Sequence, residues 1–342
     1  MEKIQPRGLI MATRLFLTIL AALYLALPSL SWSGTVQLKV ATLAPDGTEL
    51  ADILKGMKEK IKKRTQGRVE LVTYLGGVMG NDHDVIKKLK LGQVHLGAFS
   101  TLGTRVVCPE SKVLAVLPFR LDSYEELDKA KALIGGRLKS YAERHGFQML
   151  AILEQGYNQL YTKTTPVRSP HDAASIKVCT WDDVGGEILQ AIGTRPIPIS
   201  EVESIPALRS GMLDATPGPA VWVLGTQTFT LLKYVNFPKW YTSIASVAMT
   251  KKGYESLAKQ LSKEDFEVVI GLIKEIEPVV VRKAREVEEK SLAAFQEYGM
   301  EVVKLTPEEY ANFRQATSKV PDRFVGKDFP KELLDEVMQV VH

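Results

Sequence analysis

The stretch "VQLKVATLAPDGTEL" (Val36–Leu50) decides the fold expected for this chain. Apolar and polar residues alternate from Val36 to Leu43, which is the pattern of a half-buried strand. Asp46 is placed to cap a helix, with Glu49 three residues later. The apolar residues that follow at helical spacing are Leu50, Ile53, Leu54, Met57 and Ile61. A strand that leads directly into a helix is the repeating unit of an α/β protein.

The same alternation of strand and helix continues along the chain after this stretch. Strands are predicted at "RVELVTYL", "VHLGAFS" and "FQMLAIL", and helices at "NDHDVIKKLKLG" and from a Ser123–Glu126 capping box to Arg144. Strands separated by helices of roughly 10–20 residues predict a parallel sheet with covering helices. The fold class is therefore expected to be α/β.

The second half of the chain also alternates strands and helices. Strands are predicted at "IKVCT", "RPIPI", "LDATPGP" and "IASVAMT", and helices at 184–191 and up to Gly211. A long helix capped by Ser262 is predicted to reach about Tyr298, with a kink at Pro278, and another helix opens at Thr306. No low-complexity linker separates the halves, so they are expected to form two lobes that share crossover strands. Ligands bind beyond the carboxyl ends of such strands, which predicts a cleft between the lobes.

The N-terminal segment has the features of a secretory signal. Basic residues precede an apolar run from Leu15 to about Leu30, and Ser31 and Ser33 fit the spacing of a cleavage site. The run is roughly 15 residues long, whereas a transmembrane helix needs about 20. Residues 1–33 are thus predicted to be a signal peptide, and the mature protein is expected to be exported.

Composition and motifs exclude several function classes. The formal net charge is +4 over 342 residues, which gives no reason to expect a nucleic-acid partner. The sequence contains no G-x-S-x-G elbow, no phosphate-binding loop and no metal-spaced Cys/His cluster, so no enzyme, metal or cofactor is expected. Asp182 and Asp183 are interpreted as helix-capping acids instead of catalytic ones. Whether the two cysteines, Cys108 and Cys179, pair with each other is left open.

Aromatic residues recur at predicted strand ends, which is typical of a binding pocket that is mostly apolar with a few polar anchors. A protein that binds a solute without transforming it is therefore expected. The candidate ligand-binding residues are Thr42, Phe99, Ser100, Phe119, Gln155, Tyr157, Cys179, Trp181, Pro219, Trp222 and Tyr241.

The chain resembles a known family over essentially its whole mature length, namely the solute-binding proteins of TRAP transporters (the DctP type). The segments that carry the resemblance occur in the expected order: "ATLAPDGT", "TQGRVELVTYLGGVMGNDHDVIKKLKLGQVHLGAFS", "LPFRLDSYEELDKA", "PVRSPHDAASIKV" and "LRSGMLDATPGP". The resemblance implies a periplasmic protein with two α/β lobes, a long C-terminal helix across both, and a cleft that closes on one solute. It also implies delivery of that solute to the small and large subunits of a permease that an ion gradient drives.

The resemblance also assigns roles to particular positions. Most of the family has an arginine after the strand at "SIKV", and its guanidinium pairs with a ligand carboxylate; alignment places Cys179 there. The family's asparagine near the next strand falls at Gly218. Trp181 is similar to a tryptophan found in a subset that lacks the arginine. These departures favour a solute that is more apolar than usual and is not a simple carboxylate. Other sources of positive charge are Arg105, Arg120, Arg168 and Arg195.

Lobe I is expected to comprise 34–156 with about 245–280, and lobe II 157–244 with about 281–342. Two other functions stay open at this point: a periplasmic sensor or accessory protein that binds a small organic acid, and a periplasmic enzyme. The oligomeric state is not predicted.

Overall fold

The computed structural model describes residues 34–341, so the predicted signal peptide lies outside the described residues. The strands are β1 (Val36–Thr42), β2 (Val69–Tyr74), β3 (Leu96–Phe99), β4 (Phe147–Thr162), β5 (Cys179–Thr180), β6 (Ile197–Pro198), β7 (Ala215–Pro219), β8 (Tyr234–Thr250) and β9 (Glu301–Val303). The helices are α2 (Glu49–Arg64), α3 (Asp82–Lys90), α4 (Thr101–Val107), α5 (Tyr124–Arg144), α6 (Pro170–Ala173), α7 (Asp183–Ala191), α8 (Glu201–Ser210), α9 (Ala220–Gly225), α10 (Lys251–Gln260), α11 (Lys263–Glu297), α12 (Pro307–Ala316) and α13 (Lys331–Met338). Short 3₁₀ turns are η1 (Pro109–Leu114), η2 (Thr228–Leu231) and η3 (Pro321–Arg323). No helix within this part of the chain is both long and apolar enough to cross a bilayer.

The main sheet is mixed, and the expectation of a parallel sheet is wrong. Within the described residues its order is β2-β1-β3-β8-β4-β7, with β9 beside β8. β1 runs parallel to β2 and β3, whereas β8 runs antiparallel to β3 and β4, and β7 antiparallel to β4. The apolar runs of β4 and β8 are buried on both faces, and such runs identify a strand without giving its direction. β5 and β6 form a separate parallel pair.

The two longest strands, β4 and β8, pair along most of their length and link the two halves of the structure. Their register runs from Phe147 opposite Thr250 to Thr162 opposite Tyr234 and shifts near Gly156. The sequence pattern predicted only one end of each strand. The middle of β4 contains a glycine and several residues with amide side chains. Such residues predict a loop when the tertiary contacts are unknown.

Helix caps follow the sequence signals with one exception. α2 is capped by Thr48, whose Oγ1 accepts a hydrogen bond from the Ala51 amide at 3.4 Å. The predicted cap, Asp46, instead accepts from the Gly47 amide and pairs with Lys55. Asp46 forms a turn of its own before the helix, so the prediction of its role is wrong.

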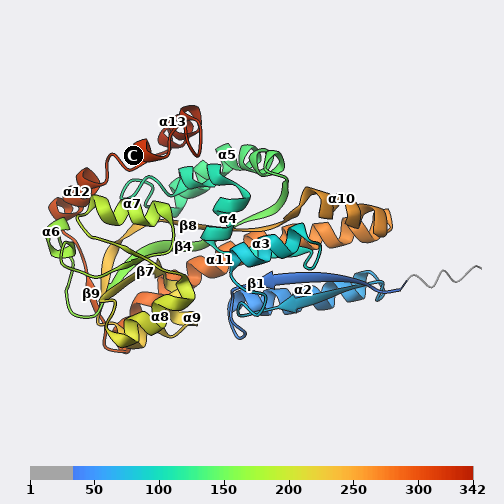
Figure 1. Ribbon diagram of the computed structural model, residues 1–342, viewed down its shortest axis with the longest axis horizontal. Coiled ribbons are helices and arrows are strands. Elements are labelled where there is room, and N and C mark those ends of the chain that lie inside the picture. The colour runs from blue at the N-terminus through green and yellow to red at the C-terminus, as the bar shows by residue number, and fades with distance from the viewer. Residues whose placement is uncertain (1–33, 342) are drawn as a thin grey trace, which may run out of the picture. The chain divides into compact units, whose positions relative to one another are not determined.

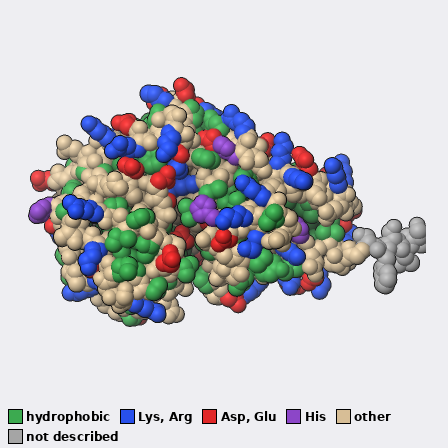
Figure 2. Space-filling view, in the orientation of Figure 1, with side chains coloured by type: hydrophobic (Ala, Val, Ile, Leu, Met, Phe, Trp, Pro, Cys, Tyr) green, Lys and Arg blue, Asp and Glu red, His purple; other side chains and the backbone are tan. Residues whose placement is uncertain are grey.

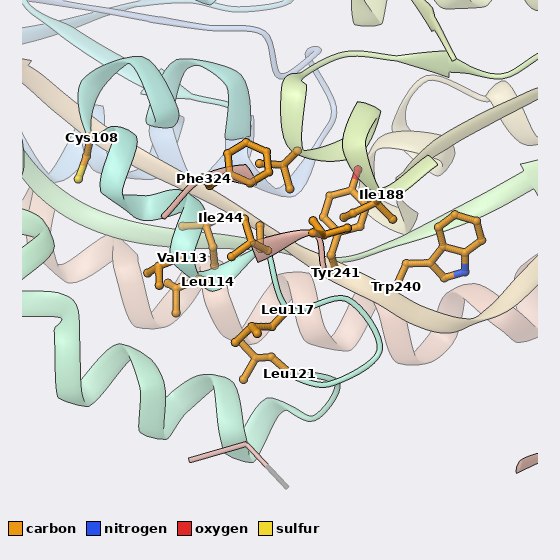
Figure 3. Close-up of a cluster of buried hydrophobic side chains, with 14 of the residues drawn as sticks. Cys108, Val113, Leu114, Leu117, Leu121, Ile188, Trp240, Tyr241, Ile244 and Phe324 are labelled. Atoms are coloured by element: carbon orange, nitrogen blue, oxygen red, sulfur yellow. The ribbon is translucent and has the colours of Figure 1, made fainter. Parts of the chain in front are cut away.

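α11 is a single helix of 35 residues, capped by Ser262 and ending before Tyr298 as predicted, and it continues through Pro278. It contacts α2, β4 and α9, and it runs from beside α10 to the end near β9 (Figure 1). The core extends over both faces of the sheet. Figure 3 shows one buried cluster in which side chains from η1 (Val113, Leu114), α7 (Ile188) and β8 (Tyr241) come together.

Candidate functional site

A pocket lies where the register-shifted middles of β4 and β8 meet the ends of shorter elements. It encloses about 430 Å³ of empty space, its open mouth included. The face in Figure 2 is hollowed between the surface of α8 and α9 and that of α3 and β1, with acidic side chains in the hollow. The residues that line the pocket are Thr101, Gln155, Asn158, Trp181, Asp182, Glu201, Pro217, Pro219, Trp222, Tyr241 and Ser243.

Five of the candidate binding residues lie in this lining: Gln155, Trp181, Pro219, Trp222 and Tyr241. The other six lie outside it: Thr42, Phe99, Ser100, Phe119, Tyr157 and Cys179. A strand-end position identifies the edge of the sheet to which a residue belongs. It does not say whether the side chain points into a pocket or into the core.

The residues outside the lining have structural contacts. Phe119 is buried in an aromatic cluster, with its ring centroid 5.4 Å from that of Phe313. Tyr157 is buried and its hydroxyl donates to the Ser123 carbonyl at 2.8 Å. Phe99 lies against Gly97 and Gly103, where a Cβ would collide with its ring.

Two further candidates outside the lining bond to nearby backbone. Thr42 Oγ1 accepts from the Ala44 amide at 3.2 Å. Ser100 caps α4 by accepting from the Leu102 amide, and its hydroxyl donates to Asp82 at 2.6 Å.

Cys179 lies outside the pocket lining and is a neutral thiol. Its side chain is fully buried, and Sγ lies 3.4 Å from Thr216 Oγ1. Burial raises the pKa of the thiol to about 11. Cys108 is also buried and free, 3.4 Å from the Leu138 carbonyl oxygen, so the two cysteines are not joined in this structure. Cys179 therefore carries no charge with which to hold an anion.

Two tryptophans form an apolar wall of the pocket. The rings of Trp181 and Trp222 meet edge-on, with centroids 4.6 Å apart at 60°. They lie over Gly218, where a Cβ would be 3.0 Å from Trp181 Cη2 and 3.5 Å from Trp222 Cε3. The glycine at this position leaves room for the tryptophan pair.

Asp182 lines the pocket and is fully engaged by the protein. It caps α7, as expected, by accepting from the Gly185 amide at 2.7 Å. It also forms an ion pair with Arg105, whose side chain is only 5% exposed. The next residue, Asp183, pairs with Lys112 at 2.6 Å. Among residues 34–341, no arginine, lysine or histidine lines the pocket.

Glu201 is a second acid in the lining and the first residue of α8. Its pKa is raised to about 8, mainly by burial and also by the negative charges of Asp82 and Asp182, while a hydrogen bond with Ser100 acts in the opposite direction. No cation within the described residues forms an ion pair with this carboxyl. No pattern in the sequence marked Glu201 as functional, because an acid in the first turn of a helix is ordinary.

Uncharged polar groups form another part of the wall. Thr101 Oγ1 and Ser243 Oγ lie 2.7 Å apart, and both approach Gln155 Oε1, at 3.4 and 3.3 Å respectively. Asn158 Nδ2 donates to the Tyr241 carbonyl at 3.4 Å. The sequence did not single out Thr101, Asn158 or Ser243, because small polar residues in long strands carry no distinctive pattern. Between 34 and 341, no group of three or more His, Cys, Asp or Glu residues is arranged to hold a metal ion.

Comparison with known proteins gives a family match over most of the chain. The model of bacterial extracellular solute-binding proteins, family 7 (DctP), matches residues 40–328. The chain is similar to the 2,3-diketo-L-gulonate-binding periplasmic protein of Escherichia coli K12, with 23% identity over 301 residues. That alignment covers 84% of this chain and 86% of the relative.

Solved structures share the fold. A TRAP periplasmic solute-binding protein from Sulfurospirillum deleyianum, with bound succinate, aligns with a TM-score of 0.81 at 23% identity, covering 90% of this chain and 99% of that one. The sugar acid binding protein of Advenella mimigardefordensis, in complex with galactonate, aligns with a TM-score of 0.80 at 19% identity, covering 90% and 99%. The mixed α/β fold and the long helix α11 are thus those of periplasmic solute-binding proteins.

Proposed function

The chain belongs to the bacterial extracellular solute-binding proteins of family 7, and from this premise we propose that it captures a small solute that is not a simple carboxylate. The observation that carries the proposal is the charge of the pocket wall. Two carboxyl groups, Asp182 and Glu201, line it, and no basic side chain of the described residues does. A carboxylate buried in such a pocket lacks the guanidinium or ammonium partner that makes its burial favourable.

The apolar part of the wall supports a solute with an apolar body. Trp181 and Trp222 present aromatic surface, and Pro217 and Pro219 add aliphatic surface. Aromatic side chains contribute more to binding than their number suggests, because each buries a large area with little loss of conformational entropy. Arg105 does not line the pocket and forms an ion pair with Asp182, while its two terminal guanidinium nitrogens are buried without a hydrogen-bond partner among the described residues.

The proposed division into lobes follows the crossover strands. Lobe I comprises 34–156 and about 245–280, and lobe II comprises 157–244 and about 281–342. On this division Thr101 contacts the solute from lobe I, and Trp181 and Glu201 contact it from lobe II. Solute drives closure only as far as it binds the closed form more tightly than the open one.

The proposed partners are the small and large subunits of a TRAP-type permease, which would take the solute from the closed protein. The proposed location is the periplasm, reached after removal of residues 1–33. The family match supports both proposals, because the family is described as extracellular and the similar structures are named as TRAP periplasmic proteins.

Thermal unfolding with defined acids tests the proposed solute class. Succinate and 2,3-diketo-L-gulonate, the acids named for the similar proteins, are expected to leave the unfolding midpoint of this protein unchanged. An organic extract of the periplasm of the producing cells is expected to raise it, because a ligand stabilises the state that it binds. A rise with either acid, lost in Trp181→Ala, would contradict the proposal.

A further inference from the structure

We propose that the solute carries a protonated amine, which Glu201 binds while the Trp181–Trp222 pair holds the apolar body of the same molecule. This inference rests on the proposed function and narrows its solute class. It follows from a difference among the acids around the pocket: Asp82 and Asp182 already have donors or an ion-pair partner in the protein, whereas Glu201 has no cation beside it in the described part of the chain.

Three carboxyl groups lie close together at this end of the pocket, and two of them are fully engaged by the protein. Asp82 is 2% exposed and accepts from the Ser100 amide, the Ser100 hydroxyl and the Gly103 amide at 3.1, 2.6 and 2.9 Å. Asp182 accepts from the Gly185 amide and pairs with Arg105. Neither acid needs a further partner.

Glu201 differs from both. Among the described residues its carboxyl has one hydrogen-bond partner, Ser100, and forms no ion pair. An ionised carboxyl in such surroundings is costly unless a cation joins it. A solute with an ammonium group supplies that cation, and its N–H groups supply the donors that the carboxyl oxygens accept.

The tryptophan pair fits the same kind of ligand. The face of an indole ring attracts a cation through its quadrupole, and Trp is the best of the aromatic residues at this. Trp181 and Trp222 also provide the apolar surface that an alkyl or aryl body contacts. A carboxylate meets repulsion from Asp182, and an alcohol supplies no cation that would favour the ionised form of Glu201.

Amine binding is expected to depend on pH. The charged and titratable groups around Glu201 are Asp82 on α3, Asp182 before α7 and, through Asp182, Arg105 on α4; Ser100 contributes only a hydroxyl. With its pKa raised to about 8, Glu201 is mostly protonated at pH 6. The affinity for an amine should therefore rise as the pH increases from 6 towards 8, with release of a proton on binding below pH 8.

Three probes of the same shape test the inference: 3-methylbutylamine, 3-methylbutan-1-ol and 3-methylbutanoate. Each is titrated into the dialysed protein by calorimetry at pH 6, 7 and 8, and thermal unfolding is measured in parallel. The amine is expected to bind most tightly, with an affinity that rises with pH. Glu201→Gln should lower the affinity for the amine roughly tenfold or more and remove the pH dependence, because a charge-assisted hydrogen bond is lost.

Glu203→Gln is the matched control. It makes the same change two residues along, at an exposed side chain that caps Ser200, and glutamine can also fill that capping position. It should bind the amine as the unchanged protein does. If the amine does not bind, binds no better than the alcohol, or binds Glu201→Gln equally well, the inference is overturned while the proposed function stands. If 3-methylbutanoate binds most tightly, both are overturned.

Discussion

At the scale of single residues, positions 179, 181 and 218 form one unit. Trp181 lies over Gly218, and Cys179 is buried beneath the same strand end against Thr216. An arginine at position 179 would enter a fully buried site, where a thiol now sits, and a side chain at position 218 would meet Trp181. Gly218 therefore leaves the room that Trp181 occupies, while Cys179 packs against Thr216 nearby.

This coupling predicts the effect of Gly218→Asn. Its Cβ would lie 3.0 Å from Trp181 Cη2, so the tryptophan ring must shift by a few tenths of an ångström to admit it. Overpacking of this kind costs about 1–3 kcal/mol, and affinity for the solute should fall roughly tenfold or more. The control is Gly136→Ala in α5, where a Cβ meets nothing within 4 Å. Calorimetric titration with the solute recovered from the periplasm measures the affinity of both variants. If Gly218→Asn bound the solute as tightly as the unchanged protein, position 218 would not belong to the binding site.

The same positions show how much of the candidate site could be predicted from the sequence. The rule that ligands bind at strand ends identified Trp181, Trp222 and Tyr241, which do line the pocket. It could not separate them from Phe119 or Tyr157, which were also predicted at strand ends but are buried in the core, Phe119 after η1 and Tyr157 inside β4. Glu201 was missed because its chemistry comes from neighbours that are distant in sequence.

At the scale of elements, α11 restrains the register shift in β4. Gly156 has φ +93° at that shift, and a Cβ there would lie 2.3 Å from Glu288 Oε2. The same oxygen of Glu288, which is buried on α11, accepts from the Tyr157 amide at 2.7 Å. Gln155 and Asn158, on either side of this contact, line the pocket. The helix thus fixes the backbone that positions the polar wall.

Gly156→Ala is expected to destabilise the fold by about 2–4 kcal/mol, because it combines an unfavourable positive φ with a collision against Glu288. Gly271→Ala in the interior of α11 is the control: a Cβ there meets nothing within 4 Å, and the change should stabilise the fold by about 0.5–1 kcal/mol. Denaturant unfolding gives both values. If the two variants proved equally stable, the restraint by α11 would be refuted.

The sequence predicted these elements unevenly, for a physical reason. Helix starts such as Ser262 before α11 and Thr306 before α12 were recognised, because capping depends on residues three positions apart. The directions of β4 and β8 were not predicted, because strand pairing is decided by residues far apart in the chain. The register shift at Gly156 was missed for the same reason, since it depends on Glu288 more than a hundred residues away.

At the scale of the whole molecule, three ion pairs made by two basic residues link the segments on either side of the pocket. Arg105 on α4 pairs with Asp182, and Lys112 on η1 pairs with Asp183 and with Asp328. On the proposed division of lobes, the pairs to Asp182 and Asp183 join lobe I to lobe II. They hold together the arrangement in which Thr101, Trp181 and Glu201 face one pocket.

The most direct test of the central claim is to identify the solute that the protein carries. The protein is purified from a periplasm without refolding, denatured and extracted with organic solvent, and the extract is compared by mass spectrometry with that from Trp181→Ala. We predict a released compound that has an apolar body and no carboxylate, and that is depleted in the variant although the variant still unfolds cooperatively. Release of a small organic acid in an amount equal to the protein would contradict the account.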